Sequence, residues 1–219
     1  MLPDQAVAHI STETIEELAD LTRQSASTPE VIAEQVLGYE LIITDEGLFS
    51  DPDILGGISF EENTIFINAS AEAHEGRYNF TVAHEIGHHV LHKDLYLAVY
   101  AGQNGIMCRE QTKKPLVERQ ADRFAAALLM PSSEISRLAA SRSKPKKLST
   151  ALQLARKIQK DLGLEHVSLS AILNRLIDLE LVSGSIPYQS SSGRFRYRKT
   201  NYPKWARWLY RIAKLFRQP

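Results

Sequence analysis

The 219-residue sequence contains only one cysteine, Cys108, and this scarcity limits its covalent and metal chemistry. One thiol cannot form a disulfide within the chain, nor can it supply a metal cluster made only of cysteines. A chain with so little cysteine is typical of a reducing compartment.

Long apolar segments are also missing. The longest apolar run near the middle of the chain, residues 124–130, is far shorter than the ~20 residues that a membrane-spanning helix requires. The first ten residues have neither the basic region nor the apolar core of a secretory signal. Hydrophobic residues nevertheless make up 43% of the sequence, enough for a core, so we expect a soluble, cytoplasmic, globular protein.

A net charge of zero conceals a strong asymmetry between the two halves of the chain. Residues 1–100 include 3 basic and 18 acidic residues, whereas residues 101–219 include 23 basic and 8 acidic ones. Such polarised halves indicate that the basic half meets an anionic surface. Nucleic acid, a membrane and the acidic half of the chain itself all fit this description.

Two polar segments predict linkers and divide the chain. Residues 141–149 are basic and include Pro145, and residues 183–193 are rich in serine and glycine. We therefore predict a first domain over residues 1–140, a small unit over residues 146–182 and a tail over residues 183–219.

The first of these parts has the pattern of an α+β domain. Helical spacing predicts helices over residues 12–24, 29–37, 78–92 and 116–130, and β-prone runs predict strands over residues 39–44, 57–60 and 64–68. The last two strands are close enough to form a hairpin. Two helices, a small sheet and two longer helices give an α+β fold.

Residues 84–88 read His-Glu-Ile-Gly-His inside the predicted helix 78–92. Positions i and i+4 share one helix face, so His84 and His88 can both reach a single Zn²⁺. Glu85 projects beside that ion, where it can accept a proton from a water that the metal activates. Apolar neighbours such as Val82 and Ile86 indicate a buried helix, which favours a metal site over two solvated histidines.

A catalytic zinc usually has three protein ligands, so a third is needed. On a continuous helix, His92 lies ~12 Å along the axis from His84, too far to share the ion. We interpret His89 and His92 as structural, although His92 could still contact a ligand, and His74 lies in a predicted loop.

Glu118 is the better candidate for the third ligand. Asp122 follows it at i+4, on the same face of the predicted helix 116–130. A second carboxylate in that position can hold the free N–H of a ligating histidine. Spacing alone leaves open the alternative that Glu118 is an exposed glutamate on an amphipathic helix.

The motifs HEIGHHVLH, at residues 84–92, and ERQADRFAAALLMP, at residues 118–131, together resemble the ImmA/IrrE family of metallo-endopeptidases. The order of elements fits this family over residues 12–182, and the tail does not. The resemblance implies a zincin-like fold, zinc ligands His84, His88 and Glu118, and Glu85 as general base. Gln120 departs from the family, whose members often have glutamate there; were that position the ligand, this chain would lack it.

The resemblance also implies a function. It would make the chain a zinc-dependent endopeptidase whose substrate is a transcriptional repressor or an antitoxin-like DNA-binding protein, so that cleavage derepresses genes. Candidate donors to the oxyanion are Arg77, Tyr96 and Tyr100. An exposed edge strand such as residues 64–68 could hold the substrate backbone.

The competing hypothesis is a regulator that binds DNA or a membrane through its basic half and keeps a structural zinc. Glu85 favours the enzyme, because a structural site has no need of a general base.

Residues 146–182 resemble a helix-turn-helix unit, which family members commonly carry, with predicted helices over residues 151–160 and 170–179. Its second helix offers Ser170, Asn174 and Arg175 as candidate readers of DNA bases. Packing against the peptidase domain or docking a substrate is the alternative role.

The tail from residue 194 holds nine basic residues and no acidic residue. Trp205, Trp208, Leu209 and Ile212 fall on one stripe of a predicted basic amphipathic helix. The predicted partners of this stripe are the acidic half of the chain, nucleic acid or an anionic membrane surface.

Overall fold

The computed structural model describes residues 7–44, 54–100, 107–108, 115–140, 143–182, 188–189 and 195–196. The chain forms two compact units, Met1–Pro131 and Ser132–Pro219. The boundary between the two units lies at Pro131, directly after a long helix. Proline lacks the backbone N–H that would continue that helix. The division into three parts over residues 1–140, 146–182 and 183–219 stays a prediction.

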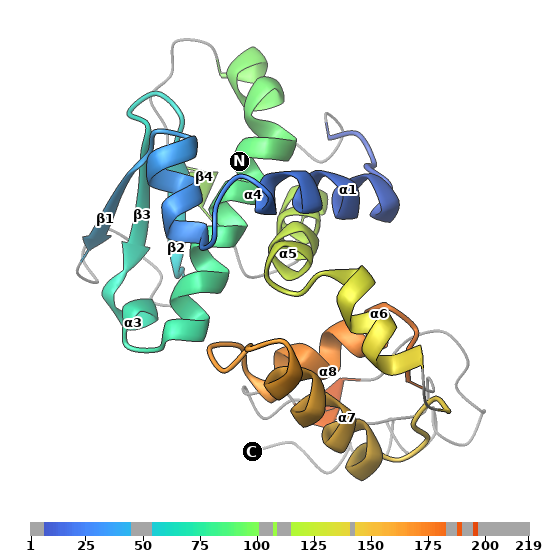
Figure 1. Ribbon diagram of the computed structural model, residues 1–219. Coiled ribbons are helices and arrows are strands. Elements are labelled where there is room, and N and C mark those ends of the chain that lie inside the picture. Colours follow the sequence, from blue (N-terminus) through green and yellow to red (C-terminus); the bar gives the residue numbers. More distant parts are fainter. Residues whose placement is uncertain are drawn as a thin grey trace, which may run out of the picture. The chain divides into compact units, whose positions relative to one another are not determined.

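The first unit contains a four-stranded sheet in the order β1-β3-β2-β4 (Figure 1). β2 (Gly56–Ser59) and β3 (Thr64–Asn68) are antiparallel neighbours, so the predicted hairpin is confirmed. β1 (Glu40–Thr44) pairs with β3 in parallel, and β4 (Met107–Cys108) pairs with β2.

The position of β3 corrects one expectation. Because β3 is hydrogen-bonded to β1 on one side and to β2 on the other, it is not an exposed edge that could receive a substrate backbone. The apolar run at residues 65–67 indicates a buried strand, but it does not show how many neighbours the strand has.

Local signals set the ends of the first helices. In α1 (Thr12–Arg23), the Ser11 side chain accepts a hydrogen bond from the amide of Thr14. α2 (Pro29–Val31) begins with proline in its first turn and continues as the π-helix η1 (Ile32–Val36). Gly38 then adopts a φ of +73°, which suits glycine, and the chain turns into β1.

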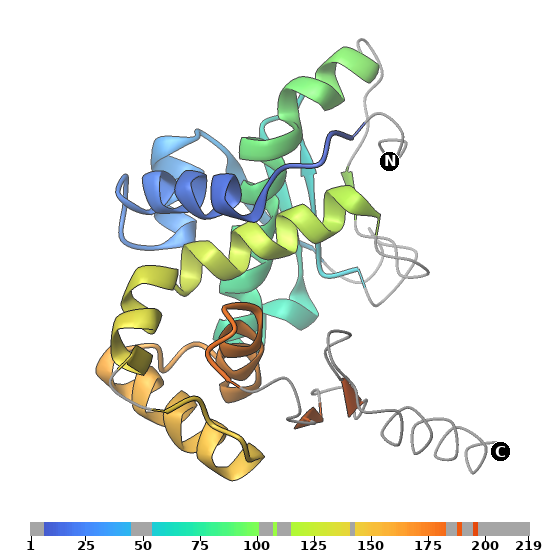
Figure 2. The same cartoon turned by 90° about the vertical axis from the view of Figure 1, so that its right-hand side faces the viewer.

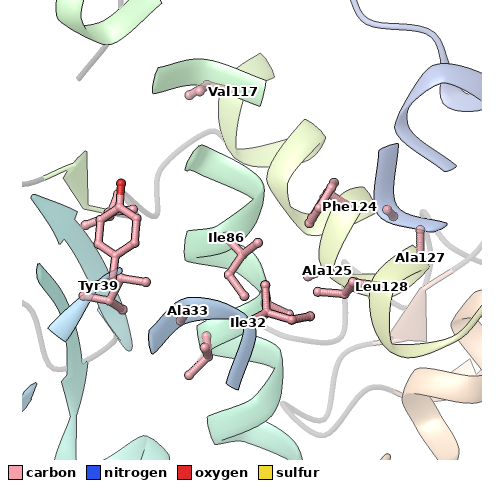
Figure 3. Close-up of a cluster of buried hydrophobic side chains, with 14 of the residues drawn as sticks. Ile32, Ala33, Tyr39, Ile86, Val117, Phe124, Ala125, Ala127 and Leu128 are labelled. Atoms are coloured by element: carbon pink, nitrogen blue, oxygen red, sulfur yellow. The ribbon is translucent and has the colours of Figure 1, made fainter. Parts of the chain in front are cut away.

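Two long helices cross beside the sheet (Figure 2). After the short α3 (Ala69–Glu72), α4 (Glu75–Val99) extends past both ends of the predicted 78–92 segment. α5 (Leu116–Leu129) packs against α4 and α1. In Figure 3, Ile86 of α4 and Ile32 of η1 lie next to each other beside the side chains of α5, and both isoleucines are almost fully buried. This core holds α4 and α5 in fixed register.

The second unit is helical over most of its described residues, with α6 (Ser132–Ala140), α7 (Leu148–Asp161) and α8 (Leu169–Asp178). Both predicted helices of residues 146–182 are therefore confirmed, although the helix-turn-helix comparison stays a prediction. Gln159 donates to the carbonyl of Val167, and Ser168 caps α8. β5 (Tyr188–Gln189) and β6 (Phe195–Arg196) pair antiparallel.

The described residues thus form a mixed α+β fold, as predicted, and most of them are helical. Among the described helices, none is long and apolar enough to cross a membrane. The predicted amphipathic helix of the tail lies outside the described residues.

Candidate metal centre

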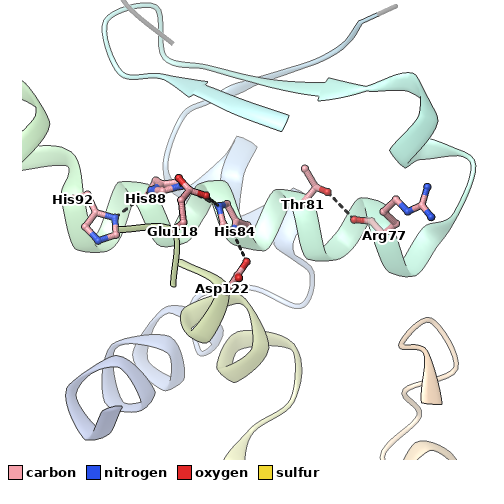
Figure 4. Close-up of polar contacts among 7 residues, drawn as sticks. All are labelled: Arg77, Thr81, His84, His88, His92, Glu118 and Asp122. Atoms are coloured by element: carbon pink, nitrogen blue, oxygen red, sulfur yellow. Dashed lines mark hydrogen bonds and ion pairs between the residues drawn. The ribbon is translucent and has the colours of Figure 1, made fainter. Parts of the chain in front are cut away.

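α4 brings two histidines to one buried point. His84 and His88 are 3% and 1% exposed, one helical turn apart on the face covered by the rest of the unit. Their Nε2 atoms lie 3.0 Å apart (Figure 4). Two imidazole nitrogens this close to each other can bind one shared cation.

Glu118 completes the cluster from the first turn of α5. Its side chain is fully buried, with Oε2 at 3.2 Å from Nε2 of His84 and Oε1 at 3.4 Å from Nε2 of His88. Within the described part of the chain, no hydrogen-bond donor other than these imidazoles serves the two oxygens. Burial alone would raise the pKa of Glu118, but the two histidines outweigh it and hold that pKa well below its usual range.

The donor set fits a zinc ion. A tetrahedral ion with bonds of ~2.0–2.1 Å separates its ligand atoms by about 3.3 Å. The two Nε2 atoms are 3.0 Å apart, and each lies 3.2 or 3.4 Å from one of the two Glu118 oxygens. Two imidazoles and one carboxylate are a common protein ligand set for catalytic zinc. A buried carboxylate without other donors also gains from a cation, because an uncompensated buried charge is costly.

Gly87 explains how α5 comes close enough. A Cβ on this residue would meet the Cα of Ala121 and two atoms of Phe124, each at 3.2 Å. Any larger side chain would therefore push α5 away from α4, and the Glu118 carboxylate with it.

Asp122 lies where the i+4 spacing placed it. Its Oδ1 is 3.2 Å from Nδ1 of His84, on the ring edge opposite the cluster. Burial alone would lower the pKa of His84, but Asp122 and Glu118 outweigh it and raise the pKa to about 9. Because Nδ1 faces a carboxylate oxygen, which only accepts, the single proton of a metal-bound His84 ring resides on Nδ1.

The other ligating histidine has a different set of partners. Nδ1 of His88 is 3.2 Å from Nδ1 of His92, and Nε2 of His92 is 2.9 Å from Oε1 of Gln120. The Gln120 amide nitrogen donates in turn to the carbonyl of Ala8 at 2.9 Å. Burial and the neighbouring His88 lower the pKa of His92 to about 4, so this imidazole is neutral at pH 7.

The family model of the IrrE N-terminal-like domain (Peptidase_M78) matches residues 52–176, more than half of the chain. The match includes α4 and α5, which carry the whole cluster. The chain belongs to this family of zinc metallopeptidases. The curated proteins contain no match to it.

In this metallopeptidase, His84, His88 and Glu118 form the HxxxH and glutamate cluster that could hold the metal ion. The burial of the group is consistent with an HExxH zincin site. Gln120, the position that departs from the family pattern, faces His92 and lies outside the ligand cluster.

Glu85 lies on the sheet side of the cluster. Its side chain is 2% exposed and lines a small cavity of about 10 Å³ together with Gly56, Thr81 and His84. A cavity of this size holds about one water molecule. Leu55 and Phe80 complete its wall.

His89 has a structural contact, as predicted. Nδ1 of His89 lies 2.8 Å from the hydroxyl of Tyr39, which ties α4 to the start of β1. His74 precedes α4 as its N-terminal cap residue and is not part of the ligand cluster.

The predicted oxyanion donors do not reach the cluster. Tyr96 is twelve residues after His84 on the same helix, ~18 Å along its axis, and packs against Phe60. Tyr100 is further still. Arg77 points away from His84 in Figure 4 and donates to the carbonyl of Ser70.

Sequence reasoning assigned no role to Gln120 beyond that of a missing ligand. The hydrogen bond that it makes joins positions 28 residues apart, so no local spacing signals it.

Proposed function

We propose that this metallopeptidase is a zinc-dependent endopeptidase in which His84, His88 and Glu118 bind the ion and Glu85 is the general base. The observation that carries the proposal is the convergence of three buried ligand atoms from two helices. A buried carboxylate beside that cluster supports the enzyme over a regulator with a structural zinc.

The side chains around the ion have separate tasks. When bound, the zinc polarises the scissile carbonyl and acidifies the attacking water. Glu85 accepts the proton of that water on its carboxylate and donates it to the nitrogen of the departing amine. The apolar side chains of Leu55 and Phe80 line the cavity beside this carboxylate and limit bulk water there. Asp122 holds the Nδ1 proton of His84 and so keeps the ring oriented.

The proposed substrate is a transcriptional repressor or an antitoxin-like DNA-binding protein in the cytoplasm, and its cleavage would derepress genes. The support for this substrate is the family resemblance of the two motifs. A DNA-binding substrate also presents basic segments, which suit the acidic residues of the first hundred positions.

The basic half of the chain has a proposed role in recognition, through nucleic acid or an anionic membrane surface. In α8, Arg175 is only 4% exposed, which argues against its predicted contact with DNA bases. Ser170 and Asn174 are partly exposed, so they remain as candidates.

Substitution of the general base tests the proposal. Glu85→Gln keeps the size of the side chain but cannot accept a proton, so it should abolish cleavage while one zinc per chain stays bound. The measurement is the appearance of new N-termini when the protein is incubated with a library of proteome-derived peptides, beside zinc content. His84→Ala should lose both zinc and cleavage. Cleavage by Glu85→Gln at the wild-type rate, or none by the zinc-loaded wild type, would overturn the proposal.

A further inference from the structure

We propose that His92 and Gln120 are positioning residues that fix the tautomer of His88, so that its Nε2 lone pair faces the metal. The inference rests on the proposed function, because it concerns a ligand of the proposed zinc site. It assigns a role to a connected chain of buried polar groups: Ala8, Gln120, His92 and His88 (the last two drawn in Figure 4).

The chain of hydrogen bonds has a defined direction that begins at Ala8. A backbone carbonyl only accepts hydrogen bonds, so the Gln120 atom at 2.9 Å from it must be the amide nitrogen. The amide oxygen of Gln120 therefore faces His92. This resolves the usual ambiguity of a glutamine side chain, whose two ends have similar shapes.

The direction passes through His92 to His88. Nε2 of His92 is 2.9 Å from the Gln120 oxygen and must donate to it. A neutral imidazole has one donor and one acceptor, so Nδ1 of His92 accepts. Nδ1 of His88, at 3.2 Å, is then the donor, and the lone pair of His88 is left on Nε2. That atom is the one that lies in the ligand cluster.

Burial strengthens this assignment. His88, His92 and Gln120 are each 1% exposed, so water does not compete for their hydrogen bonds. If His92 were protonated on Nδ1 instead, its Nε2 and the Gln120 oxygen would be two acceptors facing each other. If His88 were protonated on Nε2 instead, its Nδ1 and that of His92 would be two acceptors facing each other. An unmade buried hydrogen bond is costly, so the opposite tautomer is disfavoured.

The two ligating histidines thus have different supports. Nδ1 of His84 faces a carboxylate that is partly open to solvent, whereas Nδ1 of His88 faces a neutral and fully buried relay. The relay also ties the segment before α1 to the metal site, since it ends on the carbonyl of Ala8.

The amide of Gln120 does two things that a carboxylate in its place could not do together. A glutamate side chain at this position would still accept from His92, but it would place a carboxylate oxygen against the Ala8 carbonyl. Gln120→Glu therefore keeps the tautomer and breaks the anchor, whereas Gln120→Leu removes both contacts. This pair of variants separates tautomer control from anchoring.

The tautomers are directly observable in long-range ¹H–¹⁵N correlation spectra of the histidine rings. In the zinc-loaded protein, His88 should be protonated on Nδ1 and ligated through Nε2, and His92 should be protonated on Nε2. A His92 ring protonated on Nδ1, or a His88 ring that ligates through Nδ1, would overturn the inference. The His92 tautomer is also visible in the metal-free protein, so the inference is tested even if the chain binds no zinc and the proposed function fails.

Zinc affinity gives a second readout, measured by competition with a chromogenic chelator. His92→Phe and Gln120→Leu should weaken zinc binding about 10- to 100-fold, as is usual when the partner of a ligating histidine is lost. Gln120→Glu should stay within a few-fold of the wild type. His89→Phe is the matched control, because it makes the same change beside His88 but outside the relay. Unchanged zinc affinity in both His92→Phe and Gln120→Leu would contradict the positioning role.

Discussion

Gly56, at the start of β2, lies directly against the proposed general base. A Cβ on this residue would come within 3.1 Å of Oε1 of Glu85 and of the carbonyl oxygen of Phe66, and within 2.5 Å of Cγ2 of Thr81. The absence of a side chain therefore lets the Glu85 carboxylate rest beside the sheet. Glu85 itself does not ligate the cluster, so its position and the metal site can be disturbed separately.

Gly56→Ala should reduce the rate of cleavage at least tenfold while zinc content stays at one per chain, because the new methyl group displaces Glu85 and not the ligands. A misplaced catalytic group of this kind commonly costs one to two orders of magnitude (roughly 10²-fold per ångström). Adding Thr81→Ser removes the closest contact, so the double variant should recover stability but not activity. Wild-type activity in Gly56→Ala would show that this contact does not position Glu85.

The sequence predicts those site residues whose relative positions depend only on the local geometry of one helix. His84, Glu85 and His88 share one helix, and the i to i+4 rule alone brings the two imidazoles together. The prediction of Glu118 as the third ligand rested on two further observations, the i+4 spacing of Asp122 and the resemblance to a family. The role of Gln120 was not predictable, because it depends on how α5 is set against α4 and on a carbonyl at residue 8.

At the scale of elements, the approach of α4 to α5 determines whether the ligands meet. Gly87 sits where α4 packs tightly against Ala121 and Phe124, and the backbone Cα of Ala121 cannot move without moving α5. Small side chains on both helices thus place Glu118 opposite the histidines. The HExxH pattern allows any residue at its fourth position, but the contact with α5 restricts this position, Gly87, to a residue without a side chain.

Gly87→Ala should destabilise the fold by about 1–3 kcal/mol, the usual cost of an overpacked contact. Alanine has a better helix propensity than glycine by ~1 kcal/mol, so the cost of the overpacked contact must exceed this gain in helix stability. Zinc affinity should fall as well, because α5 carries Glu118. Chemical denaturation of the metal-free protein and chelator competition measure the two effects. Gly76→Ala, three turns earlier on α4, is the control; equal stabilities for the two variants would refute the packing argument.

The sheet shows which elements could be predicted. The β2–β3 hairpin was predictable because its two β-prone strands are close in sequence and are separated by a short polar turn. The parallel pairing of β1 with β3 joins segments more than twenty residues apart, and no local pattern specifies it. That pairing turned the predicted edge strand into a central one.

At the scale of the whole molecule, the proposed metal site and the basic tail, with its proposed recognition of an anionic partner, lie in different parts of the sequence. All three proposed ligands and Glu85 lie in Met1–Pro131, and Glu118 is the last of them. The nine basic residues after position 193 lie beyond every proposed ligand. The metal site should therefore not depend on the tail.

A chain that ends at Ser192 should keep one zinc, since no proposed ligand is lost. If the full chain binds anionic vesicles or nucleic acid, this truncation should lose most of that affinity, and binding by the full chain should fall steeply with salt. Vesicle co-sedimentation and DNA mobility shifts measure the two cases. An insoluble or unfolded truncation would show instead that the tail belongs to the core, and the recognition role would be withdrawn.

The central claim is that two histidines and one glutamate of this chain hold a catalytic zinc. Zinc K-edge X-ray absorption of the purified protein tests it most directly, because it reports the identity and distance of the ligand atoms. The account predicts only nitrogen and oxygen neighbours at ~2.0–2.1 Å, with the outer-shell signature of two imidazoles, and loss of the bound zinc in Glu118→Ala. A sulfur neighbour at ~2.3 Å, one imidazole instead of two, or an unchanged spectrum in Glu118→Ala would contradict it.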